Sequence, residues 1–293
     1  MEVRSIDHYV LVAGSLSLAR ERYRKLGFTV APDGVHPFGT YNANMYFRDG
    51  PMVETLAVEN PATYSRAAGE GNTFVRNDAI FRAAKGDYGF SHIVVTSTNA
   101  DADHGRFVAN GVSGGDIVAF SRDFERPDGT LDTVSARLSF ATHPAGPSAF
   151  YFSCQDIVVP AVDRTSLLDH ENGVLGAKHA YSTAPDPAVF EGFLKEMVDP
   201  NAVRMTRGAV DCLFPNGRTS IVPCEFLARE FGVAESGDDR ELGHRGLVFE
   251  TGDLSAVEAL FTRNSVEFVR INGRLVTHPH PESGLFFAFE QRG

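Results

Sequence analysis

Two ionisable side chains near the N-terminus stand where an apolar residue is expected. His8 shares one face of the segment IDHYVLVA with Ile6 and Val10, because side chains alternate between the two faces of a strand. Glu54 stands in the same way in the apolar face of PMVETLAV. A buried carboxylate is costly unless it is paired, protonated or bound to a cation. Together the two residues suggest a metal ion, with a satisfied core histidine and a buried ion pair as the structural alternative.

The segments around these residues predict a strand, a helix and three further strands. After the first strand, Ser15 or Ser17 can cap a helix that Gly27 ends. The segment FTV restarts a strand, and TYNANMYF alternates polar and apolar residues as the next one. The turn RDG then leads into the strand that carries Glu54. Residues 6–58 therefore form one βαβββ unit.

The same pattern recurs three more times. The second unit begins with GFSHIVVTS, and 19 residues separate its histidine from the glycine that ends its helix, as in the first unit. Its segment FSRDFERPDGTLDTV is interpreted as a long insertion before the last strands. GAKHAYSTA and LGHRGLVFE begin the third and fourth units. The first strand of every unit carries one histidine: His8, His92, His179 and His244.

The repeats divide into two predicted domains. Periodicity is lost over residues 156–176, where Pro, Asp and Gly collect, and this is typical of an interdomain connection. Units one and two form a domain over residues 1–157. Residues 158–176 are the linker, and units three and four form a second domain over residues 177–293.

The composition excludes several classes of partner. The net charge is −11 over 293 residues and there is no Lys/Arg run, which argues against nucleic acid and anionic membranes. No targeting segment or membrane-length apolar stretch is found, so a soluble cytoplasmic protein is expected. Three cysteines without C-x-x-C spacing predict neither a disulfide framework nor a zinc knuckle. The expected partner is a small molecule, and a homodimer is left open.

Several segments, most of them in the first half of the chain, carry a family resemblance: DHYVLVAGSLSLARERYRKLGFTV, HPFGTYN, VETLAV, FYFSCQ and HENGVLG. In them the chain resembles the vicinal oxygen chelate superfamily, the group of glyoxalases, bleomycin resistance proteins and extradiol dioxygenases, and in particular its glyoxalase-like branch. The resemblance implies an α+β fold in which the four modules form two saddle-shaped mixed sheets. It also implies a divalent metal ion bound by the first and last strands of paired modules.

At the matching positions, the resemblance implies metal ligands at His8, Glu54, His92, His244 and Glu290. Gln155 would complete an N-terminal set with His8, Glu54 and His92. Glu225 is a weaker candidate and is explained equally well as the start of a short helix. Each glutamate of this set follows the first-strand histidine of its unit by 46 residues. The spacing from the turn glycine argues against Glu290. Family members usually place the carboxylate four residues after a turn glycine, as Gly50 and Glu54 do, but the residue four after Gly284 is Ala288.

The pairing of the units is left open, since pairing 1 with 2, 3 with 4, or 1 with 4 would each assemble a different ligand set. The N-terminal set is preferred because the resemblance is strongest there. Imidazole and carboxylate ligands suit Fe, Zn, Ni or Mn. Two histidines with one carboxylate would also suit a non-haem iron oxygenase.

Three further residues are candidates for catalysis or substrate binding. His36 lies on the loop GVHPFGTYN, where it could serve acid–base catalysis together with Glu54, with a surface turn residue as the alternative. Asn42 and Tyr46 share one face of the following strand and are predicted to line a substrate pocket. Exposed strand polarity explains these two equally well.

Three functions follow from these observations. The preferred one is a metal-dependent glyoxalase-like enzyme, of lyase or isomerase type, whose small substrate chelates the metal through vicinal oxygens. The first alternative is an extradiol-type dioxygenase that uses non-haem Fe(II). The second is a small-molecule binding or resistance protein without turnover. A fold resemblance does not specify the substrate.

Overall fold

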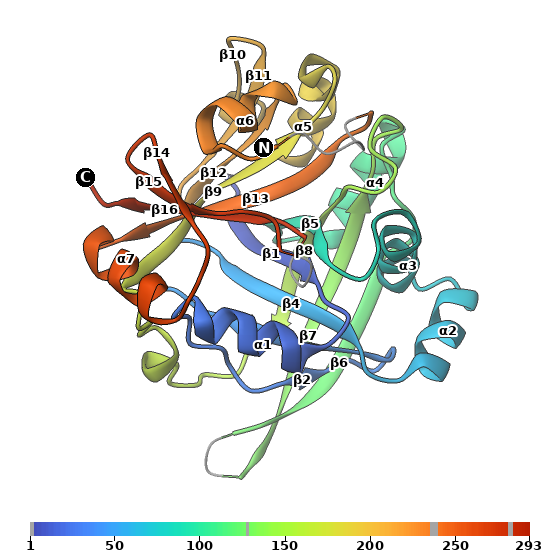
Figure 1. Ribbon diagram of the computed structural model, residues 1–293. Helices are drawn as coiled ribbons and strands as arrows, with labels where there is room; N and C mark the ends of the chain where they lie inside the picture. Colours follow the sequence, from blue (N-terminus) through green and yellow to red (C-terminus); the bar gives the residue numbers. More distant parts are fainter. Residues whose placement is uncertain (1–2, 127–128, 235–239, 281–283) are drawn as a thin grey trace.

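The computed structural model describes residues 3–126, 129–234, 240–280 and 284–293, and four successive βαβββ modules account for most of them (Figure 1). The first module contains β1 (Ile6–Val12), α1 (Leu16–Lys25), β2 (Gly34–Val35), β3 (Thr40–Met45) and β4 (Met52–Val58). The second contains β5 (Gly89–Thr96), α4 (Ala100–Ala109), β6 (Val118–Glu125), β7 (Leu131–Ala141) and β8 (Phe150–Val158).

The remaining modules are built in the same order. The third contains β9 (Val174–Thr183), α5 (Glu191–Met197), β10 (Val203–Thr206), β11 (Ala209–Phe214) and β12 (Gly217–Val222). The fourth contains β13 (Gly243–Thr251), α7 (Leu254–Arg263), β14 (Val269–Ile271), β15 (Arg274–Thr277) and β16 (Phe286–Gln291). Three helices lie between modules: α2 (Pro61–Gly69), α3 (Thr73–Lys85) and α6 (Glu225–Phe231). Short 3₁₀ helices cover Thr165–Leu167, Pro187–Phe190 and Pro200–Ala202.

The modules associate in consecutive pairs. In every module the last strand lies parallel to the first. The first strands of modules 1 and 2 pair antiparallel, with Tyr9 opposite Ile93, and those of modules 3 and 4 do the same. Modules 1 and 2 form the first half of the molecule and modules 3 and 4 the second, and in the described part of the chain one strand-pairing position, His244 with Phe90, joins their sheets. The pairing is therefore 1 with 2 and 3 with 4, and the predicted α+β fold with two saddle-shaped mixed sheets is confirmed.

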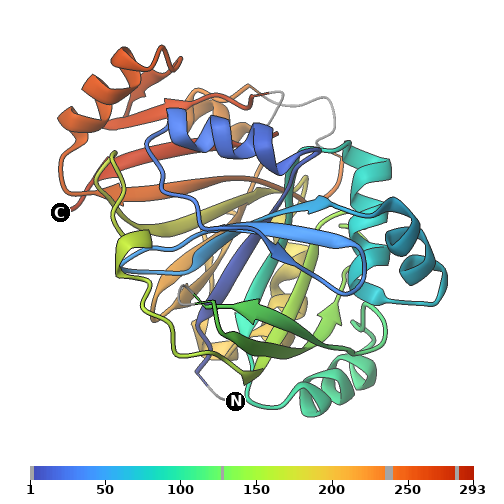
Figure 2. The same cartoon turned by 90° about the horizontal axis from the view of Figure 1, so that it is seen from below.

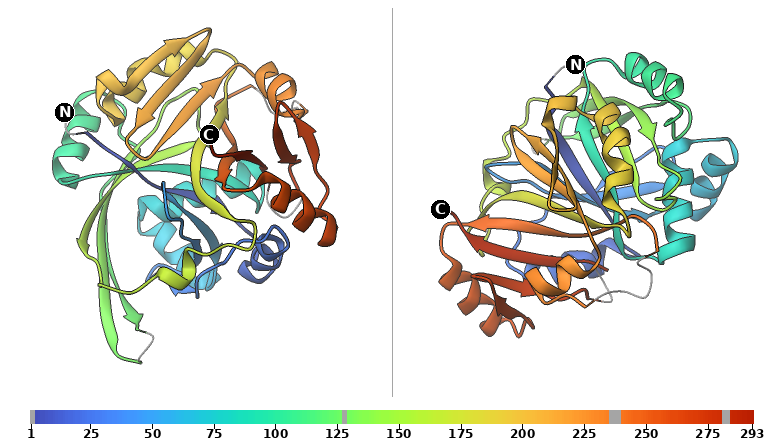
Figure 3. Two further views of the ribbon diagram at one scale, coloured as in Figure 1. Left: turned by 90° about the vertical axis from the view of Figure 1, so that its left-hand side faces the viewer. Right: turned by 90° about the horizontal axis from the view of Figure 1, so that it is seen from above.

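Two elements differ from the repeat pattern. Helices α2 and α3 lie side by side between modules 1 and 2 (Figure 1), and the pattern does not predict them, because an inserted helix pair leaves the repeats on either side unchanged. The predicted long insertion is wrong: residues 120–125 and 131–134 form the outer parts of β6 and β7, a hairpin that projects from the body of the molecule (Figure 3, left). Most side chains of this hairpin are half-buried or exposed, so polar residues on both faces hide its alternation.

An aromatic core holds the two halves together. The ring of Phe28, just after α1, lies 5.0 Å from that of Phe249 on β13 and 6.2 Å from that of Phe287 on β16. None of the three side chains is more than 3 % exposed. On the outside, the side chain of Asn264 after α7 donates a hydrogen bond to the carbonyl of Lys25, so α7 and α1 lie next to each other (Figure 2).

The described helices are short, and α2, α3, α4 and α7 begin at a polar residue whose side chain caps the helix, whereas Ser15 before α1 makes no such hydrogen bond. Asp253 caps α7 by accepting hydrogen bonds from the amides of Ser255 and Ala256. Glu225 begins α6, as its alternative interpretation predicts. The longest helix of the described residues, α3, has 13 residues, and none in that part of the chain is long and apolar enough to cross a membrane.

Candidate active site

A cavity of about 260 Å³ opens in the first half. Most of its wall is aromatic or aliphatic and comes from Phe38, Phe74, Phe120, Phe124, Val134, Ala136, Leu138 and Phe152. Polar and charged side chains also face it: Asp7, His8, His36, Asn42, Asn44, Tyr46, Glu54, Arg122, Asp156 and Arg164. A mainly apolar wall with a few convergent polar groups is typical of a small-molecule site.

His8 and Glu54 meet on neighbouring parallel strands of this wall. Glu54 of β4 lies opposite Val10 of β1, so its side chain reaches the face on which His8 lies, two residues earlier. The distance from His8 Nε2 to Glu54 Oε2 is 3.3 Å. The two residues are only 7 % and 5 % exposed. The interruption of two apolar stripes therefore marks one shared site.

Asp7 extends this pair on the other side of the imidazole, with Asp7 Oδ1 2.5 Å from His8 Nδ1. In a regular strand these neighbours would face opposite sides. The pairing of β1 with β5 shifts between Ile6 and His8, and this bulge lets Asp7 line the same cavity. The alternation of a regular strand places Asp7 on the opposite face from His8, so the sequence pattern does not predict Asp7 in the site. The signal that could have found it is a carboxylate directly before a candidate histidine.

The pair is held as an imidazolium and a carboxylate. Burial alone would lower the pKa of His8, but hydrogen bonds to Asp7 and Glu54 and their negative charges raise it to about 10. Burial would raise the pKa of Glu54, but the hydrogen bond and charge of His8, with smaller contributions from His36 and Asn42, lower it to about 2. His8 is therefore protonated and Glu54 ionised at neutral pH.

His36 lies across the carboxylate from His8. Its Nε2 is 3.9 Å from Glu54 Oε1 and its Nδ1 is 2.9 Å from Thr40 Oγ1. Its ring stacks on that of Phe38 at 5.1 Å, so the residue lines the cavity and is not a surface turn residue. Burial lowers the pKa of His36 to about 4, against the charge of Glu54 and with the help of Arg122. His36 is therefore a neutral imidazole at neutral pH.

Asn42 links the two rings through Glu54. Its Nδ2 donates to Glu54 Oε1 at 2.5 Å and lies 3.5 Å from His36 Nε2. The contacts with Thr40 Oγ1 and the Asn42 amide favour the tautomer of His36 that carries its proton on Nδ1 and its lone pair on Nε2. Tyr46 also lines the cavity, where its hydroxyl accepts a hydrogen bond from Asn44 at 3.1 Å. The two predicted substrate contacts are thus both in the cavity wall, and their contact with a substrate stays a prediction.

Protonation of His8 predicts a pH dependence of stability. The pKa of His8 is raised in the folded protein, so its contribution is complete below the unfolded value of 6.5 and is lost as the pH rises toward about 10. Between pH 6.5 and about pH 9, the free energy of unfolding of the wild type should fall by about 3 kcal/mol relative to that of His8→Gln. Urea unfolding of both proteins across this range measures the difference. Parallel curves would contradict the imidazolium assignment.

His92, the second predicted ligand of the first half, does not face the cavity. Its ring stacks between those of Phe74 and Phe150, at 5.9 and 5.2 Å, and is 0 % exposed. Nδ1 lies 2.8 Å from Ser91 Oγ, while Nε2 has no hydrogen-bond partner among the described residues. Burial lowers the pKa of His92 to about 3. The ring is thus a neutral, enclosed core side chain, and Phe74 of the inserted α3 helps to enclose it.

The predicted ligands of the second half lie elsewhere again. His244 sits at the junction of the halves, where Nδ1 is 2.8 Å from Ser182 Oγ and Nε2 donates to the carbonyl of Phe150 at 3.3 Å. Glu290 on β16 accepts a hydrogen bond from Arg274 at 2.8 Å. These two residues therefore do not join His8 and Glu54.

Strand register explains why the predicted set is not assembled. Glu54 lies opposite the residue two positions after the first-strand histidine of its module. The corresponding residues of modules 2, 3 and 4 are Phe152, Ser220 and Phe286. Gln155 instead accepts a hydrogen bond from the amide of Ala100 at the start of α4. The repeated separation of 46 residues thus reflects loop lengths and not equivalent places in the sheets.

The side chains present do not fit the metal site that the resemblance implies. Within residues 3–126, 129–234, 240–280 and 284–293, no three His, Cys, Asp or Glu side chains come together in a way that could hold a metal ion. Glu54 also faces His8 and His36 with different oxygens. A divalent Fe, Zn, Ni or Mn cofactor stays a prediction.

A family model described as a glyoxalase-like domain matches residues 6–198, about two thirds of the chain. The chain belongs to this glyoxalase-like domain family. The match contains every residue that lines the cavity. It confirms the resemblance to the glyoxalase-like branch of the vicinal oxygen chelate superfamily. A search of curated proteins finds no match.

Solved structures resemble the glyoxalase-like chain over nearly its whole length. A hypothetical protein from Staphylococcus aureus has a TM-score of 0.65 and 12 % identity, with 99 % of this chain and 100 % of that one covered. A mutant of 4-hydroxymandelate synthase from Streptomyces coelicolor has a TM-score of 0.58 and 13 % identity, with 100 % of this chain and 94 % of that one covered. The Mn(II)-bound glyoxalase from Novosphingobium aromaticivorans has a TM-score of 0.55 and 9 % identity, with 99 % of this chain and 82 % of that one covered. At such identities the likeness shows the fold and not the reaction.

Proposed function

We propose that this glyoxalase-like protein is an enzyme of lyase or isomerase type that transfers a proton on a small carbonyl compound. One observation carries the proposal: Asp7, His8, Glu54 and His36 form a row in the wall of a largely apolar cavity. Two imidazoles of opposite protonation state then flank one carboxylate. Environments that push two pKa values apart are typical of an acid and a base in one active site.

His8 is the proposed acid of this row. Its Nε2 lies 3.3 Å from Glu54, which is long for a hydrogen bond between charged groups, so a ligand oxygen can share this N–H with the carboxylate. Asp7 holds the other ring nitrogen at 2.5 Å and keeps the ring oriented and protonated. In the reaction, this N–H stabilises the negative charge that develops on the carbonyl oxygen as a neighbouring C–H bond breaks.

His36 is the proposed proton acceptor, and Glu54 holds both rings. The lone pair of Nε2 takes the proton of the C–H bond, and the bond's electron pair moves toward the carbonyl. The carboxylate of Glu54 lies 3.9 Å from this nitrogen and stabilises the imidazolium that forms. Return of the proton to a different carbon completes an isomerisation, and departure of a β-substituent instead completes an elimination.

The wall of the cavity indicates what kind of molecule is bound. Phe38, Phe74, Phe120 and Phe152 present apolar surface around the polar row. A volume of about 260 Å³ suits a compact ligand with an aromatic or branched aliphatic body. Binding of such a body would also displace water from the row, which strengthens its electrostatic interactions.

The side chains alone can supply both proposed steps, stabilisation of the carbonyl oxygen by His8 and removal of the C–H proton by His36. The dioxygenase alternative needs two histidines and a carboxylate around one Fe(II). The first-strand histidine that the resemblance pairs with His8 is His92, and its ring is stacked between Phe74 and Phe150. His36, the other histidine beside Glu54, lies on the opposite carboxylate oxygen from His8. The arrangement of donors therefore favours lyase or isomerase chemistry over ring cleavage.

Solvent exchange of carbon-bound protons tests the proposal without knowledge of the natural substrate. Phenylacetone, benzylacetone and benzoylpropionate are incubated with the protein in D2O, and loss of the proton signals beside the carbonyl is followed by NMR. We expect His8→Gln to lower the exchange rate by about 10²- to 10³-fold.

His179→Gln is the matched control for this experiment. His179 is the corresponding first-strand histidine of module 3 and is hydrogen-bonded to Ser220 at 2.7 Å, outside the cavity. Its substitution should change the exchange rate less than about twofold. Tight binding of the probes without exchange would favour the binding or resistance protein.

Elemental analysis of the same protein, purified without chelator, tests the cofactor prediction. Exchange by the side chains alone should persist after treatment with a chelator. If chelation removes about one equivalent of Fe, Zn, Ni or Mn together with the exchange activity, the metal-dependent mechanism implied by the resemblance replaces the one proposed here.

A further inference from the structure

Arg122 is a positive charge in the cavity wall without an acidic partner. It lies on β6, opposite Val134 of β7, in the projecting hairpin (Figure 3, left). Among the described residues it has no ion pair, and its buried Nε has no hydrogen-bond partner. Three carboxylates line the cavity: Asp7 and Glu54 are already occupied by His8, and Asp156 forms no ion pair with Arg122 in the described part of the chain. A buried N–H without an acceptor is unfavourable, so an acceptor from a ligand would complete it.

The chain leaves room for this guanidinium. A Cβ at Gly34 would lie 2.7 Å from Arg122 Nη1 and 2.6 Å from Asn42 Oδ1, so a side chain there would displace the ends of both residues. Gly34 belongs to β2 and is not among the glycines with a left-handed backbone.

Arg122 lies beside the row formed by Asp7, His8, Glu54 and His36, and this position determines which part of a bound ligand it contacts. The ring of Phe120, two residues before Arg122 on β6 and so on the same face of the strand, lies 5.6 Å from that of His36. Asn42, beside Arg122 at Gly34, is hydrogen-bonded to Glu54. A group bound by Arg122 thus lies next to the groups that move the proton.

We propose that Arg122 binds a carboxylate of the substrate, so the substrate class is a small carbonyl compound that also bears a carboxylate and has an apolar body. The planar fork of a guanidinium matches the two oxygens of a carboxylate. Arg122 is then the residue that selects acids over neutral carbonyl compounds. This inference rests on the proposed function for the carbonyl group, but the binding of the carboxylate can be tested separately.

The test compares an acid with its neutral ester. Calorimetry measures the Kd of benzoylpropionate and of its methyl ester for the wild type, Arg122→Met and Arg122→Lys. The wild type should prefer the acid, and Arg122→Met should raise the Kd of the acid by about 10- to 100-fold while changing that of the ester less than about threefold. Arg122→Lys, which keeps the charge but loses the fork, should give an intermediate loss.

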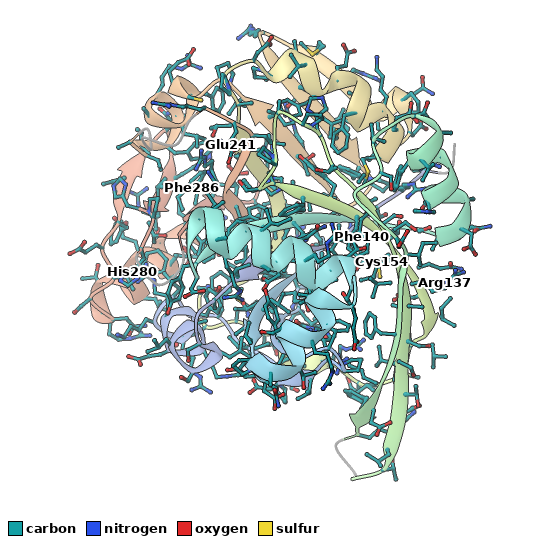
Figure 4. All side chains as sticks on the ribbon, turned by 90° about the vertical axis from the view of Figure 1, so that its right-hand side faces the viewer. Arg137, Phe140, Cys154, Glu241, His280 and Phe286 are labelled. Atoms are coloured by element: carbon teal, nitrogen blue, oxygen red, sulfur yellow. The ribbon has the colours of Figure 1, made fainter. Side chains whose placement is uncertain are left out.

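Arg137→Met is the matched control. Arg137 lies on β7 of the same hairpin and points toward the outside of the molecule (Figure 4). Cys154 on the neighbouring strand β8, which lines the cavity, lies further inside. Arg137 binds Asp101 through both terminal nitrogens, at 2.6 and 2.7 Å. Its substitution should leave both Kd values unchanged.

Two results would overturn the proposal: no preference of the wild type for the acid, or an equal loss of acid and ester in Arg122→Met. The exchange assay reports on the proposed function independently, because binding can be selective for the acid even if no exchange occurs. Absent exchange with a selective loss in Arg122→Met would leave the carboxylate site standing and contradict the catalytic role.

Discussion

Replacing Glu54 by glutamine is expected to lower the rate of proton exchange by about 10³-fold, near the middle of the range for loss of general acid–base catalysis. Glutamine keeps the volume and the acceptor for Asn42, so the loss comes from the charge. Without it the pKa of His8 falls, because Glu54 contributes both a hydrogen bond and a negative charge to that ring. The imidazolium that would form on His36 also loses its nearest counter-charge.

Glu290→Gln is the control for this change. Glu290 is the carboxylate of the last strand of module 4, and it is hydrogen-bonded to Arg274 in the second half. Its substitution should leave exchange at the rate of the wild type. Thermal unfolding of both variants shows whether the fold is retained. Equal rates in Glu54→Gln and Glu290→Gln, in folded proteins, would remove Glu54 from the mechanism.

Phe28→Ala should give the largest loss of stability, about 3–5 kcal/mol in the free energy of unfolding. The ring contacts those of Phe47, Phe249, Phe287 and Phe289, so its removal leaves a cavity between the two halves. Aromatic side chains on every side limit how far the cavity can collapse. Urea unfolding followed by circular dichroism measures the loss.

A second phenylalanine provides the comparison. Phe124 is half-buried at the cavity wall, on the projecting hairpin. Phe124→Ala should lower the free energy of unfolding by less than about 1.5 kcal/mol, because much of its surface is already accessible to water. If Phe28→Ala were no more destabilising than Phe124→Ala, the aromatic contact between the halves would not be a principal source of stability.

The sequence predicted the architecture well because the modules repeat. Each βαβββ unit has its own strand alternation, helix and glycine stop, and four copies reinforce one another. The first-strand alternation also placed His8 on the correct face, and the alternation of β4 did the same for Glu54. These two residues do meet, which a periodic pattern can predict because both strands lie in one small module.

The rest of the site depends on quantities that periodicity does not contain. Residue counts gave 46 for both His8 to Glu54 and His244 to Glu290, but parallel register places Phe286 at the corresponding position. The bulge that turns Asp7 into the cavity breaks the alternation on which the prediction relied. Arg122 lay in a segment interpreted as an insertion, where no strand face was assigned to it.

The protonation states of His8 and His36 are the most direct test of the proposed acid and base. Long-range ¹H–¹⁵N correlation spectra of the histidine rings, recorded at about pH 8 and assigned with His8→Gln and His36→Gln, report both. We expect His8 to be an imidazolium at this pH and His36 to be neutral, with its proton on Nδ1. A neutral His8 or a protonated His36 would contradict the assignment of acid and base, and with it the proposed proton transfer.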